Sequence, residues 1–138
     1  PSAKDFITPL TLSTLSNYPV ISDFTDDEDD NAVWNNHVEL GLWADLFVVA
    51  PATANTLSKM ASGNSDNFLI ATYLSAKCPV YFAPAMDLDM YKHPTTQKAL
   101  ETLQSYDNLR PYPRKTGRGA WQESKPYRQF IAVAELAR

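Results

Sequence analysis

Residues 46–56 read LFVVAPATANT, and this stretch decides the fold class of the 138-residue chain. Its first five residues form a continuous apolar run with two valines and a phenylalanine, which predicts a strand covered on both faces. A proline then ends the run, and the threonine and asparagine residues that follow can cap a helix. The stretch therefore predicts a buried strand that leads into a helix.

A second stretch repeats this pattern, because residues 79–83 read PVYFA and end at Pro84. A shorter strand is predicted over residues 18–22. Between the strands, apolar residues recur at helical spacing and predict helices, the last of them over residues 90–106. Strands that alternate with helices predict an α/β fold, with a doubly wound, Rossmann-like parallel sheet in three layers. Ligands of such sheets bind outside the carboxyl ends of the strands.

The composition excludes several classes of protein. Apolar residues make up 44% of the chain and charged residues 20%, which predicts a globular protein. No apolar run approaches the roughly 20 residues of a membrane-spanning helix. We therefore expect a cytoplasmic protein that has no membrane as a partner. The single cysteine, Cys78, rules out an internal disulfide, and two distant histidines, His37 and His93, argue against a metal site.

Charge is distributed unevenly along the chain. Residues 1–108 carry 5 Lys or Arg against 14 Asp or Glu, whereas residues 109–138 carry 7 against 2. An acidic main part repels a phosphate backbone, so nucleic acid is not expected as a partner. The five consecutive carboxylates at residues 26–30 predict a solvated loop rather than a calcium loop, which spaces its ligands and contains a turn glycine.

Three groups of residues are candidates for chemistry. Thr53–Thr56 lie at a predicted helix start, which favours an anion or a polar ring edge, although N-capping explains them as well. His37 lies near another helix start, where the dipole disfavours the imidazolium and leaves a neutral base, but a lone histidine is more often incidental. Met86, Asp87 and Met90 follow the second strand, where they suit either an aromatic ligand or a core and an N-cap.

Four segments, taken in order, resemble the family of flavin-dependent cysteine decarboxylases, with the greatest similarity to phosphopantothenoylcysteine decarboxylases. The segments are residues 3–10 (AKDFITPL), 37–45 (HVELGLWAD), 50–56 (APATANT) and 84–91 (PAMDLDMY). Order and spacing agree from residue 1 to about residue 107, over three quarters of the chain. Several motifs in one order make the resemblance specific.

The resemblance implies an FMN cofactor, and a homotrimer or an assembly of trimers with flavin at the subunit interfaces. It implies decarboxylation of a small-molecule substrate, 4′-phosphopantothenoylcysteine, to 4′-phosphopantetheine in coenzyme A biosynthesis. In that reaction the thiol is oxidised by FMN, CO2 leaves the thioaldehyde, and the electrons return. A fused phosphopantothenoylcysteine synthetase domain is a further partner that the resemblance suggests.

The resemblance also assigns roles to individual residues. His37 matches the active-site histidine of the family. The matches to flavin-contacting positions are Thr53, Ala54, Asn55, Thr56, Ala85 and Met86. Asp87 occupies the position of a substrate-binding asparagine, and Met90 lies in the same substrate motif.

Three departures from the family pattern are visible. The chain begins after the family's first strand and its glycine-rich phosphate loop, so we expect residues 1–108 to form a flavoprotein domain without them. Asp87 replaces asparagine, and an ionised carboxylate accepts hydrogen bonds but does not donate them. Residues 109–138 form an atypical basic tail that lacks the family's Gly-Arg-Met loop and its cysteine.

Two other functions fit the sequence. One is a non-catalytic subunit with the flavin fold that only oligomerises or regulates a partner. The other is a related flavoprotein that acts on peptidyl cysteine or prenylates flavin. Turnover of phosphopantothenoylcysteine separates the decarboxylase from both.

Overall fold

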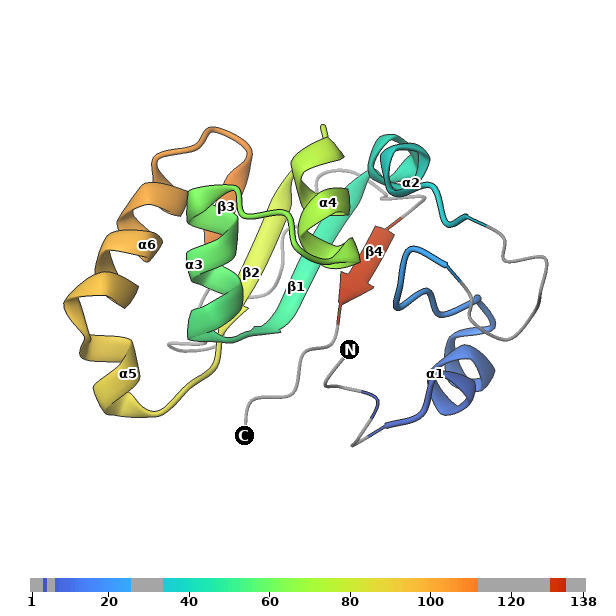
Figure 1. Ribbon diagram of the computed structural model, residues 1–138, viewed down its shortest axis with the longest axis horizontal. Coiled ribbons are helices and arrows are strands. Elements are labelled where there is room, and N and C mark those ends of the chain that lie inside the picture. The colour runs from blue at the N-terminus through green and yellow to red at the C-terminus, as the bar shows by residue number, and fades with distance from the viewer. Residues whose placement is uncertain (1–3, 5–6, 26–33, 112–129, 134–138) are drawn as a thin grey trace, which may run out of the picture.

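The computed structural model describes residues 4, 7–25, 34–111 and 130–133. Its sheet has four parallel strands in the order β3-β2-β1-β4 (Figure 1). The strands are β1 (Leu46–Ala52), β2 (Val80–Pro84), β3 (Leu109–Pro111) and β4 (Phe130–Val133). The predicted parallel, Rossmann-like sheet is therefore confirmed. The predicted boundary after residue 108 stays a prediction, because most of the following residues lie outside the described ones.

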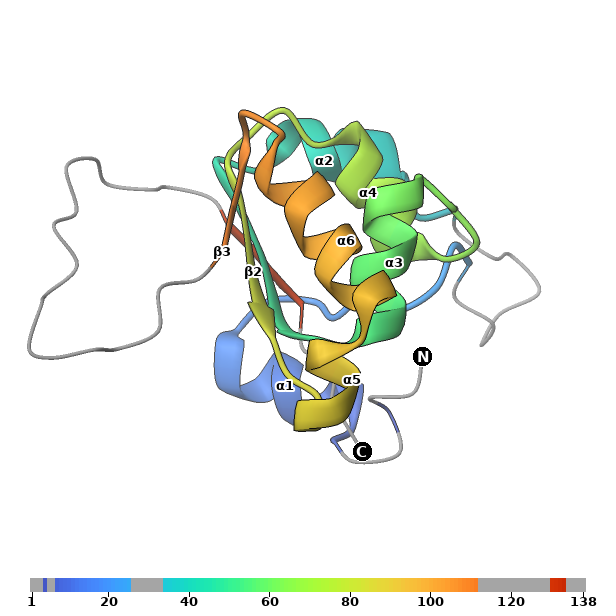
Figure 2. The same cartoon turned by 90° about the vertical axis from the view of Figure 1, so that its left-hand side faces the viewer.

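Four of the six described helices pack on one face of the sheet (Figure 2). They are α2 (His37–Trp43), α3 (Ala54–Ser62), α4 (Phe68–Ser75) and α6 (Pro94–Gln104). The other two, α1 (Pro9–Ser16) and α5 (Leu88–Lys92), lie beyond the ends of the strands (Figures 1 and 2). A helical layer on the opposite face stays a prediction, since the described helices that cover the sheet all lie on one side.

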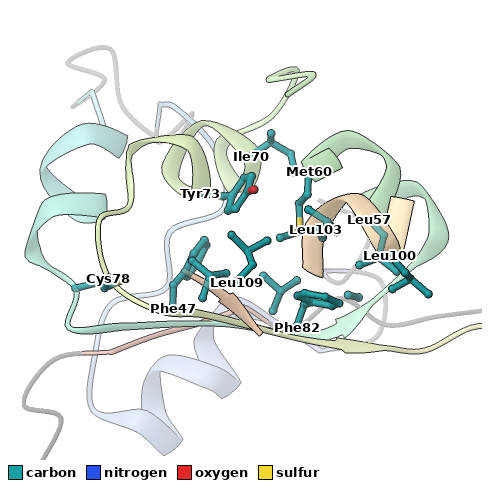
Figure 3. Packing of buried hydrophobic residues seen from close by; sticks show 14 residues of the cluster. Phe47, Leu57, Met60, Ile70, Tyr73, Cys78, Phe82, Leu100, Leu103 and Leu109 are labelled. Atoms are coloured by element: carbon teal, nitrogen blue, oxygen red, sulfur yellow. The ribbon is translucent and has the colours of Figure 1, made fainter. Parts of the chain in front are cut away.

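The core lies between the sheet and these helices. Alternate residues of β1 and β2 point into it, and Phe47, Val49, Val80 and Phe82 are fully buried. Leucine, isoleucine and methionine side chains of α3, α4 and α6 meet them there (Figure 3). The residues of β1 on the other face, such as Val48, are only half-buried. The strand was expected to be covered on both faces, and this second face is covered in part.

Capping residues position three helices as the sequence indicates. Asn36 caps α2 by accepting from the backbone N–H of Val38 (3.1 Å) and of Glu39 (3.2 Å). Thr53 caps α3, and Asn67 caps α4 by accepting from the N–H of Ile70 at 3.0 Å. Each cap satisfies N–H groups that have no partner inside their helix, which fixes where the helix begins.

Two sequence predictions were wrong. The helix expected over residues 90–106 is divided into α5 and α6 at His93–Pro94. Proline lacks an N–H and disfavours helical geometry in the residue before it, so His93 is extended and caps α6. Residues 18–22 form no strand either, because no neighbouring strand pairs with them within the described part of the chain.

Candidate functional site

The carboxyl ends of β1 and β2 meet at one edge of the sheet. Ala52 lies opposite Pro84, and the N–H of Ala85 donates to the carbonyl of Ala52 at 2.9 Å. The segments that follow, Thr53–Thr56 and Ala85–Met90, are called the strand-end loops below. They open at the same end of the sheet, where α3 and α5 begin (Figure 1). This is the edge at which ligands of parallel sheets bind.

In the first strand-end loop, two threonines serve the helix itself. The Thr53 hydroxyl accepts from the N–H of Thr56 at 3.3 Å and donates to the Thr56 hydroxyl at 3.3 Å. Thr56 is buried, whereas the side chain of Asn55 is exposed and Ala54 is half-buried. Capping therefore accounts for Thr53, and Asn55 is the polar side chain of this loop that is open to a ligand.

In the second strand-end loop, Asp87 is the N-cap of α5, and its Oδ1 accepts from the N–H of Met90 at 2.9 Å. Met86 is half-buried and packs against the core, while Met90 is exposed. The two alternatives from the sequence, an N-cap and a ligand contact, are compatible, because one carboxylate oxygen holds the helix and the other is open to solvent or a ligand.

His37 is the first residue of α2, and its Nδ1 is buried without a hydrogen-bond partner among the described residues. Its ring meets the edges of Phe24 and Phe68, with centroids 5.7 and 6.5 Å away. Trp34 stacks on Phe24 at 5.5 Å. These four residues are called the His37 cluster below. Buried polar atoms without a hydrogen-bond partner are rare in proteins, and those that do occur are often part of a functional site.

The three aromatic members of the His37 cluster were not expected to lie together. Phe24 and Trp34 flank the acidic run, and the chain brings them together by a bridge between Thr25 and Trp34. Phe68 reaches the cluster from the first turn of α4. The large aromatic residues on either side of five carboxylates were the one signal in the sequence, and it did not indicate Phe68.

His37 and the strand-end loops come from different helices of one layer. α2 lies beside α4, and the ring of His37 packs on Phe68, the first residue of α4. The candidate residues therefore form two groups, the His37 cluster and the strand-end loops.

Neither a reactive cysteine nor a metal site is found beside the His37 cluster or the strand-end loops among the described residues. Cys78 is buried just before β2, and burial raises the pKa of its thiol, which keeps the thiol protonated and unreactive. No group of three His, Cys, Asp or Glu side chains among the described residues is arranged to hold a metal ion. The described helices are also too short or too polar to cross a membrane.

Comparison with known proteins shows which family shares this arrangement. The Flavoprotein family model matches residues 1–132. A cysteine/cysteine sulfinic acid decarboxylase from an unknown prokaryotic organism is 60% identical over 102 residues, which are 74% of this chain and 28% of that protein. The coenzyme A biosynthesis bifunctional protein CoaBC of Bacillus subtilis (strain 168) is 40% identical over 102 residues, 74% of this chain and 25% of that protein.

Solved structures agree with this. The FMN-dependent cysteine decarboxylase SpaF superposes with a TM-score of 0.68 at 36% identity, over 79% of this chain and 60% of that chain. The peptidyl-cysteine decarboxylase EpiD gives a TM-score of 0.64 at 27% identity, over 82% and 64%. The chain thus spans about a quarter of the first curated relatives and about 60% of the first solved chain. On this fold and this match, the chain belongs to the Flavoprotein family.

Proposed function

We propose that this chain is the flavin-binding part of an FMN-dependent decarboxylase that removes the carboxylate of a cysteine-type thiol. The observation that carries the proposal is the pair of strand-end loops at the carboxyl edge of a sheet that superposes on FMN-dependent cysteine decarboxylases. A probable phosphopantothenoylcysteine decarboxylase of Streptococcus mutans, 40% identical over 117 residues, supports 4′-phosphopantothenoylcysteine as the substrate, with 4′-phosphopantetheine as the product. The relative that is 60% identical supports free cysteine instead.

The residues present at the strand-end loops fit a flat ring system. The side chains of Ala54 and Ala85 are single methyl groups, and both residues are only half-buried, so a ring can approach the backbone there. Residues 50–56 carry no charge, and the exposed amide of Asn55 can both donate and accept hydrogen bonds. We assign the flavin contacts to Thr53–Thr56, Ala85 and Met86. A bound FMN supplies the reversible two-electron oxidation of the thiol-bearing carbon, so CO2 leaves without an external oxidant.

The remaining residues act on the substrate. Asp87 follows Met86 directly and Met90 lies three residues further along, and both would contact the substrate where it meets the flavin. His37 is the candidate base that takes the thiol proton, because its buried Nδ1 has no hydrogen-bond partner among the described residues. Phe24 and Phe68 hold its ring in place through their edge contacts.

A second copy of the chain can bring His37 to the strand-end loops. The helices near the two groups expose apolar side chains, among them Leu10 and Leu15 of α1 and Leu42 and Trp43 of α2. Large apolar side chains that stay exposed on helices are available for contact with another protein. We infer a homotrimer or an assembly of trimers in which the flavin lies between subunits.

The first test is a visible absorption spectrum of the purified chain with added FMN. Flavin absorbance that stays with the protein through gel filtration supports the flavin site. Release of CO2 from a cysteine-type thiol then supports the decarboxylase. A colourless protein that ignores FMN would contradict both, and would favour a subunit with the fold but without the chemistry.

The same assay tests His37. We expect His37→Asn to lower kcat by at least about 100-fold, the usual contribution of general acid–base catalysis. Bound flavin should remain, since the flavin contacts are assigned to the strand-end loops and not to His37. His93→Asn is the matched control, because it removes the other histidine while asparagine can still cap α6. Full turnover by His37→Asn would refute the assignment.

A further inference from the structure

The strand-end loops carry a carboxylate, Asp87, that forms no ion pair with another residue in the described part of the chain. Oδ1 of Asp87 is held by the N–H of Met90 at 2.9 Å, which fixes the direction of the carboxylate, and the side chain is exposed. The ion pairs among the described residues are Lys4–Asp23 and Lys59–Asp66, and neither involves Asp87. Lys92, the one cationic residue of α5, lies at the other end of that helix.

Capping does not require this charge. Asparagine and aspartate are about equally good N-caps, because each offers one side-chain oxygen to the helix N–H groups. The first turn of α5 already contains a second carboxylate, Asp89, so helix-dipole stabilisation does not depend on Asp87 alone. The charge at Asp87 is therefore available for a ligand.

We propose that Asp87 is a specificity-determining residue that binds the ammonium group of an unacylated cysteine. This proposal rests on the proposed function, and it favours free cysteine over 4′-phosphopantothenoylcysteine as the substrate. Both substrates bring a carboxylate, which Asp87 repels. Only free cysteine also brings an ammonium group, which pairs with Asp87 in a charge-assisted hydrogen bond. The nitrogen of an N-acylated cysteine is a neutral amide, so that substrate meets the repulsion without the compensating ion pair.

The preference is a difference between two affinities, and Asp87 acts on both of them. An asparagine at this position can donate hydrogen bonds to the substrate carboxylate, whereas an ionised aspartate cannot. Aspartate therefore weakens binding of the acylated substrate and strengthens binding of the free amino acid. The 60% identity to a cysteine/cysteine sulfinic acid decarboxylase agrees with this direction.

The test compares the FMN-loaded chain with Asp87→Asn and with Asp89→Asn as the matched control. Asp89→Asn removes a carboxylate from the same helix turn, two residues away from Asp87. CO2 release is measured with L-cysteine, N-acetyl-L-cysteine and 4′-phosphopantothenoylcysteine. We expect the unsubstituted chain to prefer L-cysteine in kcat/KM. Asp87→Asn should lower that value about tenfold, mainly through KM, while the value for both acylated substrates stays or rises. Asp89→Asn should change neither.

Equal losses for all three substrates in Asp87→Asn, or a preference of the unsubstituted chain for an acylated substrate, would overturn the proposal. Binding of cysteamine and of N-acetylcysteamine, measured by calorimetry, gives a readout that does not need turnover. Tighter binding of cysteamine that is lost in Asp87→Asn supports the role of Asp87 even if no CO2 is released, an outcome that would refute only the proposed function. Equal binding of the two thiols would overturn the role of Asp87.

Discussion

At the scale of single residues, the chain shows how one side chain can serve structure and chemistry together. Asp87 holds α5 with one carboxylate oxygen and presents the other at the strand-end loops. Thr53 is different, because its hydroxyl is engaged on both sides by Thr56. The sequence pattern is the same in both loops, a polar residue at a helix start. Hydrogen-bond geometry shows that Thr53 uses its one side-chain donor within the helix, whereas Asp87 caps with Oδ1 and keeps its second oxygen outside the cap.

Tyr73 provides a test of burial at this scale. Burial of its ring in α4 raises the pKa of the phenol to about 12. Folding therefore favours the neutral phenol, and this contribution to stability is complete below pH 10 and is lost as the pH rises through about 12. In an alkaline titration followed at the tyrosinate band, we expect one of the seven tyrosines to ionise last. Tyr73→Phe should remove that late step, and its persistence would contradict the assignment.

At the scale of helices and strands, the capped helices and the two buried strands could be predicted, because their signals are local. A continuous apolar run ending in proline predicts β1 and β2, and Asn36, Thr53 and Asn67 predict where three helices begin. The break between α5 and α6 has a local cause too, Pro94, which the helical spacing around it concealed.

The site could be predicted in part for the same reason. Both strand-end loops could be predicted, because a proline and polar residues follow each apolar run and because ligands of parallel sheets bind at the carboxyl ends of the strands. The distance between these loops and His37 could not be predicted, since it depends on the packing of α2 against α4. No local pattern indicates that Phe24, Trp34 and Phe68 gather around His37, because these residues come from three separate segments.

The contact between α2 and α4 depends on Gly41. A Cβ at this buried position would lie 2.9 Å from the backbone carbon of Ser75 and 3.0 Å from the Thr72 carbonyl oxygen. We expect Gly41→Ala to destabilise the fold by about 1–3 kcal/mol, despite the better helix propensity of alanine, because α2 must move away from α4. Urea denaturation measures the loss. Ser58→Ala, on the exposed side of α3, is the control and should be neutral or slightly stabilising.

At the scale of the whole molecule, the exposed apolar residues are the main feature. α1 has no buried residue, and its Leu10 and Leu15 are 74% and 75% exposed. Because no residue of α1 is buried in the core of the chain, core packing does not explain its leucines. Contact with a second copy of the chain does explain them.

Sedimentation equilibrium tests this inference. We expect the unsubstituted chain to have a mass of three chains or a multiple of three, and the double variant Leu10→Gln/Leu15→Gln to shift toward a single chain. Bound flavin should decrease with the mass if the flavin lies between subunits. Glu101→Gln, on the exposed surface of α6, should leave the mass unchanged. A single-chain mass for the unsubstituted protein at all concentrations would refute the assembly.

The all-parallel pairing of the sheet has a consequence for how the protein forms. Phe47 pairs with Val80, Val80 with Leu109, and Leu46 with Phe130, so the four described strands form no hairpin that could appear early and locally. Each pairing closes a long loop whose entropy is lost before the contact compensates for it, and such topologies fold slowly. On the ribosome, β1 would therefore wait for β2 to be synthesised before these two strands can pair, a period in which binding by a chaperone would protect it from aggregation.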